Sequence, residues 1–487
     1  MSVLGVGTVC FDFLARRKAA VTAPSSYGLL RRNSWPLLIF AAAVLIRLSL
    51  FAFIARYYPE RFFANDSFEY DKLALNLSVH GRSSPSDRAP FAPEIRRTPV
   101  YPLFLAATYR AFGHHPRIAI LLQLLLNSLT CVLVYEGGRR ILERRITRVI
   151  GLLAVVDLSF LRYSAVLLSE ALLVFLLSVG CACFVWHYAQ RKGGWCIAAS
   201  GVLFGLSALC KPIALYLPVV LFVLVFVRSR DAICLRSNAL FLLSFLITIA
   251  PWTIRNYQRF GVPLFSTIRG ENLLFYNAAF LEASRDKQSI AAVRSKLEAE
   301  VEAQAGGEAL GVVERYRILE RIAAHKIRSH PLSYLEVTLK GIVFLFLAQR
   351  EYLFPDDPSP TSLGRGYVRR LLLEKNYSKK IEAMGQVPDY LFNIPITTYF
   401  FVMNICMFLG VVHSLKARHL ASLLLLIVVG YFAIVTGPLG CSRFRCPIVP
   451  HILLLAGYGL GAFGRIQRAI WPCEWSTNAA ADNSVPM

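Results

Sequence analysis

The carboxylate at position 66 has the residue type and the surroundings of a general base. It lies in residues 65–70 (NDSFEY), soon after the first long apolar stretch of the chain. At helical spacing Asp66 and Tyr70 share one face, and a carboxylate held at a membrane surface can accept a proton from an attacking hydroxyl. A structural role fits as well, because Asp66 followed three positions later by Glu69 is like a capping box. The residues alone leave both interpretations open.

A second carboxylate, Glu170, stands where residues 168–170 (LSE) open another long apolar run. A charge entering such a run is costly unless it is paired or faces a wet cavity. It is also favourable as an N-terminal helix charge beside a Ser cap. Both interpretations have equal support. Arg97 precedes two prolines in residues 97–102 (RTPVYP), which predict a short helix with a rigid start.

Four basic residues follow or precede apolar runs at positions expected on one side of a membrane: Lys211, Arg255, Arg443 and Arg445. Ammonium and guanidinium groups bind phosphate through charge-assisted hydrogen bonds. Each residue taken singly fits interfacial anchoring better, with Trp252 as a belt aromatic beside Arg255. Their common side favours a phosphate ligand, such as a phosphate carried on a lipid.

The elements that must position these residues are membrane-spanning helices. The chain has 487 residues, 56% of them hydrophobic, and mean hydropathy +0.51, and spans of about 20 apolar residues recur along it. We therefore predict an all-α polytopic membrane protein. Ten spans are expected, at about 35–57, 116–136, 148–161, 166–188, 195–210, 213–227, 238–254, 393–412, 419–437 and 447–464.

The basic residues between the spans predict the orientation. Residues 1–34 form a basic cytoplasmic N-terminus, and 466–487 form a cytoplasmic tail. The outer side then receives loop 58–115, with two short juxtamembrane helices, and loop 255–392. Within the second loop, 332–349 is apolar but carries Glu336 and Lys340, which suits an interfacial or re-entrant helix better than an eleventh crossing.

Several function classes are disfavoured by composition and by missing motifs. The formal net charge of +23 invites a nucleic-acid interpretation, but aromatic–basic RNA motifs are lacking, and short basic loops account for much of the excess. There is no P-loop, dinucleotide fingerprint or HExxH metal motif. We therefore expect no nucleic acid partner, no cofactor and no metal site, although a divalent cation stays open.

The order of these motifs resembles the bacterial branch of the GT-C glycosyltransferases, similar to protein O-mannosyltransferases and lipid A aminoarabinose transferases. The resemblance covers about residues 35–465. It rests on an outer D-x-x-x-Y helix, an R-x-P-x-Y-P-like helix, S-E at the fourth span, K-P after the fifth, P-W-x-x-R-N after the seventh and R-F-R-x-P before the last.

The resemblance implies a GT-C bundle of ten to eleven helices in the inner (plasma) membrane, with its active site on the periplasmic or extracellular side. The implied donor is a sugar on polyprenyl phosphate, transferred with inversion. Asp66 matches the family's catalytic carboxylate and Glu170 a second acidic site residue. The implied substrate-binding residues are Tyr70, Arg97, Lys211, Arg255, Arg443 and Arg445, of which the last three would contact phosphate.

The acceptor stays open among lipid, glycan and protein. The chain departs from the eukaryotic mannosyltransferases, whose first loop carries an Asp-Glu pair, because Asp66 is flanked by Asn65 and Ser67. Two other functions use the same basic outer face: a transporter or flippase of lipid-linked sugars, which needs no base at Asp66, and a ligase of lipid-linked glycans. A non-catalytic membrane scaffold is a further alternative.

Overall fold

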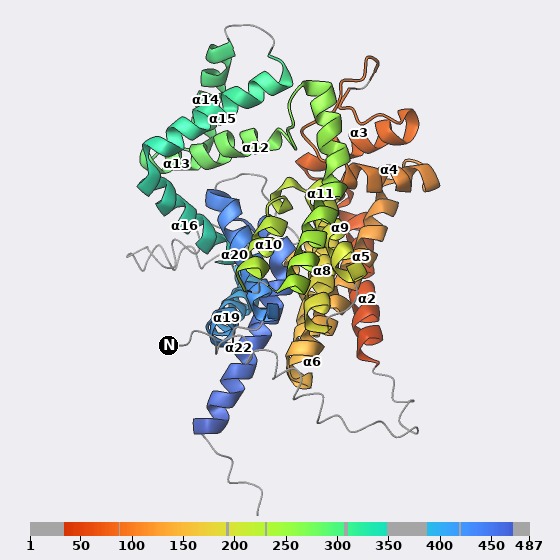
Figure 1. Ribbon diagram of the computed structural model, residues 1–487, viewed down its shortest axis with the longest axis vertical. Coiled ribbons are helices and arrows are strands. Elements are labelled where there is room, and N and C mark those ends of the chain that lie inside the picture. Colours follow the sequence, from red (N-terminus) through yellow and green to blue (C-terminus); the bar gives the residue numbers. More distant parts are fainter. Residues whose placement is uncertain are drawn as a thin grey trace, which may run out of the picture.

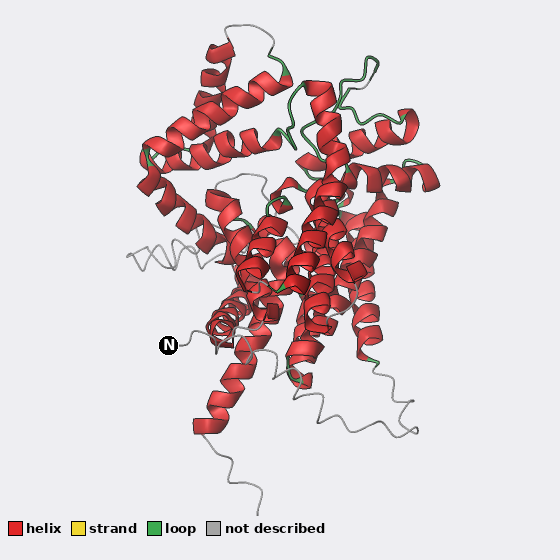
Figure 2. Ribbon diagram, viewed as in Figure 1, coloured by secondary structure: helices red, strands yellow, loops and turns green. Residues whose placement is uncertain are grey.

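The protein is helical throughout the part of the chain that its computed structural model describes, and Figure 2 shows helices and loops there without a strand. Within a bilayer, helices pair every backbone N–H and C=O inside their own segment. The predicted all-α class is confirmed. The residues described are 34–86, 88–190, 194–228, 231–305, 310–347, 387–417 and 420–470.

Parts of three predicted segments lie outside the described residues: 1–33 of the basic N-terminus, 348–386 of the second outer loop and 471–487 of the tail.

The α-helices are, in chain order, α2 (Trp35–Tyr57), α3 (Asn65–His80), α4 (Val100–Phe112), α5 (Pro116–Ile141), α6 (Arg144–Val156), α7 (Leu158–Ser164), α8 (Glu170–Gln190), α9 (Gly194–Cys210), α10 (Leu217–Arg228), α11 (Ala232–Phe260), α12 (Ile268–Asn272), α13 (Ala279–Arg285), α14 (Ile290–Ala305), α15 (Val312–Ser329), α16 (Pro331–Leu347), α19 (Val387–Ala417), α20 (Leu420–Thr436), α21 (Ser442–Arg445) and α22 (Val449–Ile470).

Seven helices among the described residues are long and apolar enough to cross a membrane, or up to eight if the bent pair α15–α16 counts as one span. The seven are α2, α5, α8, α11, α19, α20 and α22 with short flanking turns, and α9 and α10 are shorter apolar helices. The predicted number of ten crossings therefore stays a prediction. The third predicted span is interrupted: α6 ends at Val156, and Asp157 caps α7 by accepting a hydrogen bond from the backbone N–H of Phe160 at 3.1 Å.

The short and polar helices gather at one end of the bundle, which we call the outer end. Figure 1 shows α3, α4 and α12 to α15 at this end, while α6 and the last turns of α22 lie at the opposite end. Both helices predicted in loop 58–115 are present as α3 and α4, and they pack on each other. Helices α3 and α4 therefore lie at the same end as α12 to α15, which come from a later part of the chain.

Of the predicted interfacial segment 332–349, residues 332–347 lie in α16, and 348–349 lie outside the described residues. Helix α16 follows α15 after a bend of 101° and packs on the turn at residues 437–439 and on α20. Its Glu336 and Lys340 are exposed and paired with each other, with Lys340 Nζ 2.5 Å from Glu336 Oε1. An exposed ion pair fits an interfacial position, since a pair at a bilayer centre would be costly.

One charged side chain inside an apolar helix was missed by the sequence patterns. Arg47 of α2 is completely buried. Its Nε donates to Asn127 Oδ1 at 2.9 Å, and its Nη1 donates to the carbonyls of Ala43 and Val155, each at 3.2 Å. These bonds replace the lost hydration of the guanidinium and fasten α2 to α5 and α6.

Helices α19 and α22 approach so closely that only glycine fits at their crossing. A Cβ atom on Gly410 would overlap the carbonyl oxygen of Leu455, and one on Gly459 would overlap that of Cys406. Small residues commonly allow such close backbone contact in membrane bundles.

We expect Gly459→Ala to destabilise the protein by about 1–3 kcal/mol through overpacking. The matched control is Gly430→Ala in α20, where an added Cβ meets nothing within 4 Å and where Ala favours the helix. Thermal unfolding of the purified protein in detergent measures both. Equal midpoints for the two variants would contradict the close crossing.

Candidate active site

Helix α3 presents Asp66 in its first turn, and the side chain does not cap the helix. The reciprocal cap bond comes instead from Ser67, whose Oγ accepts the backbone N–H of Ala64 at 2.8 Å. This frees both carboxylate oxygens of Asp66 for other partners. The capping interpretation of Asp66 is therefore not the one that the geometry favours.

Two arginines from distant parts of the chain hold Asp66. Arg97 Nη2 lies 2.8 Å from Oδ1, and Arg443 Nη1 lies 2.6 Å from Oδ2. Burial by itself raises the pKa of Asp66, but Arg443 and Arg97 outweigh it and hold the pKa of this carboxyl well below its usual range. Asp66 is therefore ionised at every physiological pH, with 26% of its side chain still exposed.

Glu170, the first residue of α8, binds two cationic side chains. Lys211 Nζ lies 2.6 Å from its Oε1, and Arg443 Nε donates to the same oxygen. The Glu170 side chain is completely buried, and its Oε2 has no hydrogen-bond partner among the described residues. Arg443 thus bridges the two predicted catalytic carboxylates.

Tyr70 lies beneath Arg97 rather than beside open space. The guanidinium of Arg97 stacks over the Tyr70 ring at 5.0 Å, and Tyr70 packs edge-on against Tyr101 at 4.8 Å. Arg97 Nε also donates to Glu69 Oε2 at 2.7 Å. Burial lowers the pKa of Arg97, but Tyr70, Asp66 and Glu69 more than offset this and raise it above its ordinary value. Tyr70 therefore supports the arginine that holds Asp66.

Three members of this cluster were not predicted as site residues: Glu69, Arg96 and Glu271. Arg96 donates from Nε and Nη2 to Glu271 of α12, at 2.8 Å to Oε1 and 2.8 Å to Oε2, and from Nη1 to Glu69. Arg96 stands next to the predicted Arg97, which was the one available signal. Glu271 is 175 residues away in the short helix α12, so no sequence pattern pointed to it.

The whole cluster is electrically balanced. It holds four carboxylates (Asp66, Glu69, Glu170 and Glu271) against four cations (Arg96, Arg97, Lys211 and Arg443). An anionic ligand can therefore be held here only by sharing cations with the carboxylates. The exposed edge of Arg443 suits this, since its Nη2 has no hydrogen bond to any described residue.

Two predicted phosphate contacts lie apart from this cluster. Arg255 donates from Nη1 to Asn256 Oδ1 at 2.8 Å and to the carbonyl of Glu94, and so supports the segment that carries Arg96 and Arg97. Arg445 is buried and donates to the carbonyls of Leu345 and Phe346 at 3.3 and 3.1 Å. Residues 443 and 445 stand about 200° apart on α21, so only one of them faces Asp66. Phosphate contact by Arg255 and Arg445 stays a prediction.

No group of three or more His, Cys, Asp or Glu side chains with metal-binding geometry occurs among the residues that the structure describes. Each carboxylate of the cluster is instead paired with a guanidinium or ammonium group. Metal and cofactor independence stay predictions.

About a third of the chain matches a known family profile. Residues 96–254 match the sequence profile of the dolichyl-phosphate-mannose-protein mannosyltransferases. That region contains Arg97, Glu170 and Lys211 and ends one residue before Arg255. None of the curated proteins matches the chain.

Solved structures extend the likeness over most of the chain. The archaeal oligosaccharyltransferase AglB from Archaeoglobus fulgidus, in complex with an inhibitory peptide and a dolichol-phosphate, superposes with TM-score 0.51 at 14% identity, covering 91% of this chain and 52% of AglB. The chain has the GT-C fold. It spans about half the length of AglB, and the resemblance inferred from the motifs is confirmed at this level.

A second similar structure is that of ArnT from Cupriavidus metallidurans in the apo state, with TM-score 0.37 and 14% identity over 88% of this chain and 77% of ArnT. Within the GT-C fold of this chain, the ion-pair cluster occupies the outer end, where α3, α4 and α12 meet the bundle.

Proposed function

We propose that this GT-C protein is a glycosyltransferase that moves a sugar from a polyprenyl-phosphate donor to an acceptor hydroxyl, with inversion and with Asp66 as general base. The observation that carries the proposal is the position of Asp66. It is a partly exposed, ionised carboxylate held by Arg97 and Arg443 at the outer end of an apolar helix bundle. We further propose that this end faces the periplasm or the cell exterior.

The proposed reaction breaks the bond between the anomeric carbon and the phosphate oxygen. The acceptor hydroxyl attacks the anomeric carbon from the opposite face, its proton passes to Asp66, and polyprenyl phosphate leaves with the bonding electrons. The transition state has oxocarbenium character. Phosphate is already a good leaving group, so it requires charge stabilisation more than protonation, and fixed cations supply this.

Arg443 and Lys211 are the proposed donor-phosphate residues. Both hold Glu170 and retain some exposure, 26% for Arg443 and 14% for Lys211, whereas Glu170 has none. A phosphate can reach the two cations but not the carboxylate behind them. We therefore assign Glu170 the role of positioning residue, which holds both cations at the depth where the donor phosphate enters.

The engagement of Arg443 has a consequence for the base. When the donor phosphate draws on Arg443, Asp66 loses part of the positive charge that keeps its pKa low and becomes a better proton acceptor. A base with a higher pKa takes up the acceptor proton with more driving force. Donor binding and base strength are therefore coupled through one guanidinium.

The pH dependence of transfer should shift when Arg97 is replaced. Arg97 stabilises the ionised form of Asp66, so its removal raises the pKa of the base. As the pH is lowered, transfer activity is then lost at a higher pH than in the unchanged protein. We expect the acid limb of kcat against pH to move upward in Arg97→Gln and to stay near its original position in Arg97→Lys, which keeps the charge. An unshifted limb in Arg97→Gln would exclude Asp66 as the titrating base.

The proposal is tested by reconstituting the full chain in liposomes with a polyprenyl-phosphate sugar and a panel of lipid, glycan and peptide acceptors. Release of polyprenyl phosphate, counted against the glycosylated product, measures transfer, and NMR of the product gives its anomeric configuration. Mass spectrometry of surface glycans and lipids from cells with and without the protein identifies the natural acceptor. Movement of intact donor across the bilayer without phosphate release would instead support a flippase.

A further inference from the structure

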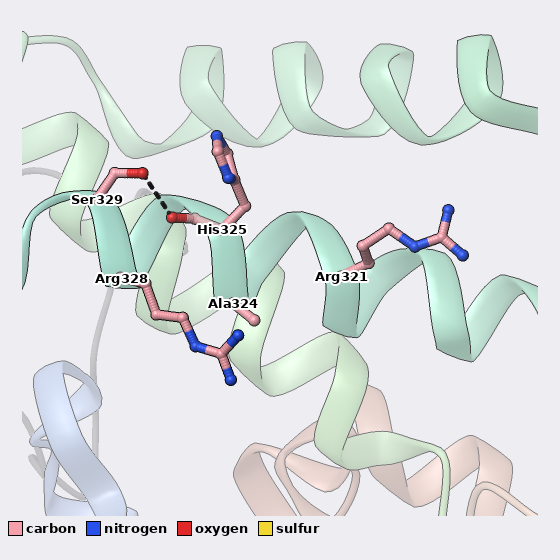
Figure 3. A pocket seen from close by; sticks show the side chains of 5 residues that line it. All are labelled: Arg321, Ala324, His325, Arg328 and Ser329. Carbon is pink, nitrogen blue, oxygen red and sulfur yellow. Dashed lines mark hydrogen bonds between the residues drawn. The ribbon is translucent and has the colours of Figure 1, made fainter.

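A row of unneutralised basic side chains runs along the outward face of α15. Arg317, Arg321, His325 and Arg328 are exposed and recur at one-turn spacing, so they share one face. The opposite face of the helix is buried, with Leu319, Ile322 and Ala323 in a small hydrophobic core beneath it. Figure 3 shows Arg321, His325 and Arg328 projecting from α15. These three residues, with Ala324 and Ser329, line a shallow cavity of about 390 Å³.

Three of the acidic residues near this row are engaged elsewhere, and a fourth, Glu314, is exposed one turn before Arg317. Glu282 and Glu300 pair with Lys326, and Glu320 pairs with Arg269. No ion pair joins Arg317, Arg321 or Arg328 to a described carboxylate. The row therefore presents net positive charge, unlike the balanced cluster around Asp66.

The row ends where the chain turns toward the membrane. Arg328 lies three residues before α16, which leaves α15 at 101°. Leu332, Leu335, Leu339 and Val343 form an apolar stripe on the exposed side of α16, each more than half exposed. The exposed ion pair of Glu336 and Lys340 lies beside this stripe. A cationic groove thus continues directly into an apolar surface.

A row of cations next to an apolar surface matches one kind of ligand. A phospholipid carries an anionic phosphate next to acyl chains, and Arg binds phosphate through paired hydrogen bonds. Basic clusters bordering a membrane helix attract anionic lipid headgroups. We propose that the α15 row and the α16 stripe form a binding site for an anionic phospholipid of the surrounding leaflet, with the phosphate at Arg321 and Arg328 and an acyl chain along α16.

The site lies apart from the residues proposed to carry out the transfer reaction. It lies on α15 and α16, outside the cluster of Asp66, Arg97 and Arg443. Bound lipid would hold the α15–α16 bend against the bilayer. It would thereby fix the distance between the membrane surface and helices α12 to α15, of which α12 carries Glu271.

Native mass spectrometry of the detergent-purified full chain tests this proposal. Phosphatidylglycerol is the probe, phosphatidylcholine with the same acyl chains is the neutral comparison, and glycerol phosphate is the soluble headgroup. Each basic residue at an anionic lipid surface contributes about fivefold. We therefore expect Arg321→Ala/Arg328→Ala to weaken phosphatidylglycerol binding roughly thirtyfold.

The matched control is Arg110→Ala/Arg285→Ala, which removes the same charge from exposed positions at the outer end. It should leave binding unchanged, and Leu339→Gln should weaken phosphatidylglycerol but not glycerol phosphate. Equal loss in control and test variants would overturn the site. So would equal binding of phosphatidylcholine, or glycerol phosphate binding as tightly as the lipid.

Discussion

Asp66→Asn should lower the turnover number for sugar transfer by about 10²–10⁴-fold, the usual contribution of a general base. Asparagine keeps the shape of the side chain but cannot accept the proton of the acceptor hydroxyl. The donor phosphate is proposed to contact Arg443 and Lys211, so the KM for donor should change much less than kcat. Initial rates in liposomes at several donor concentrations separate the two constants.

Asp71→Asn is the matched control for this substitution. Asp71 lies on the same helix and accepts a hydrogen bond from the Tyr109 hydroxyl at 2.6 Å, which asparagine can preserve. This variant should keep near-normal turnover. Retained turnover in Asp66→Asn, or an equal loss in both variants, would rule out Asp66 as the base.

Arg443→Ala should impair both stability and donor use. The substitution leaves Glu170 fully buried with Lys211 as its one remaining cation and leaves Asp66 with Arg97. Breaking a buried ion pair by removing one partner costs about 3–5 kcal/mol. Because Arg443 is partly exposed, we expect about 2–3 kcal/mol in free energy of unfolding. A lost charge-assisted hydrogen bond to phosphate also weakens donor binding, by about 10–100-fold.

The double variant Arg443→Ala/Glu170→Gln separates these two effects. Glutamine at position 170 removes the fully buried carboxylate that has lost one of its two cations, but it also leaves Lys211, which is 14% exposed, without its counter-ion. The thermal midpoint should therefore recover only part of the way toward that of the unchanged protein. Transfer should not recover, because the guanidinium is still missing. If activity returned together with stability, Arg443 would serve the fold alone and the donor phosphate would have to bind elsewhere.

The helical class and the two outer helices were predictable because they depend on local patterns. Apolar runs long enough to cross a bilayer identify spans, and helical spacing after the first span predicts the helix that carries Asp66. Glu336 and Lys340 also predicted an interfacial or re-entrant helix at 332–349, since they disfavour a buried span, and this stays a prediction. The crossing number was not fixed in the same way, because several apolar helices are short or interrupted, as at Asp157.

What only the tertiary structure decided is which charges meet. Arg443 and Arg445 have equal standing in the sequence, but their positions on a short helix send one to Asp66 and the other to the carbonyls of α16. The ion pair of Arg96 with Glu271 joins two segments at the outer end, and no local sequence pattern shows that these segments lie close together. Local spacing determines which helices form and which residues share a face. Long-range ion pairs depend on how those helices cross, and that is settled by packing over the whole bundle.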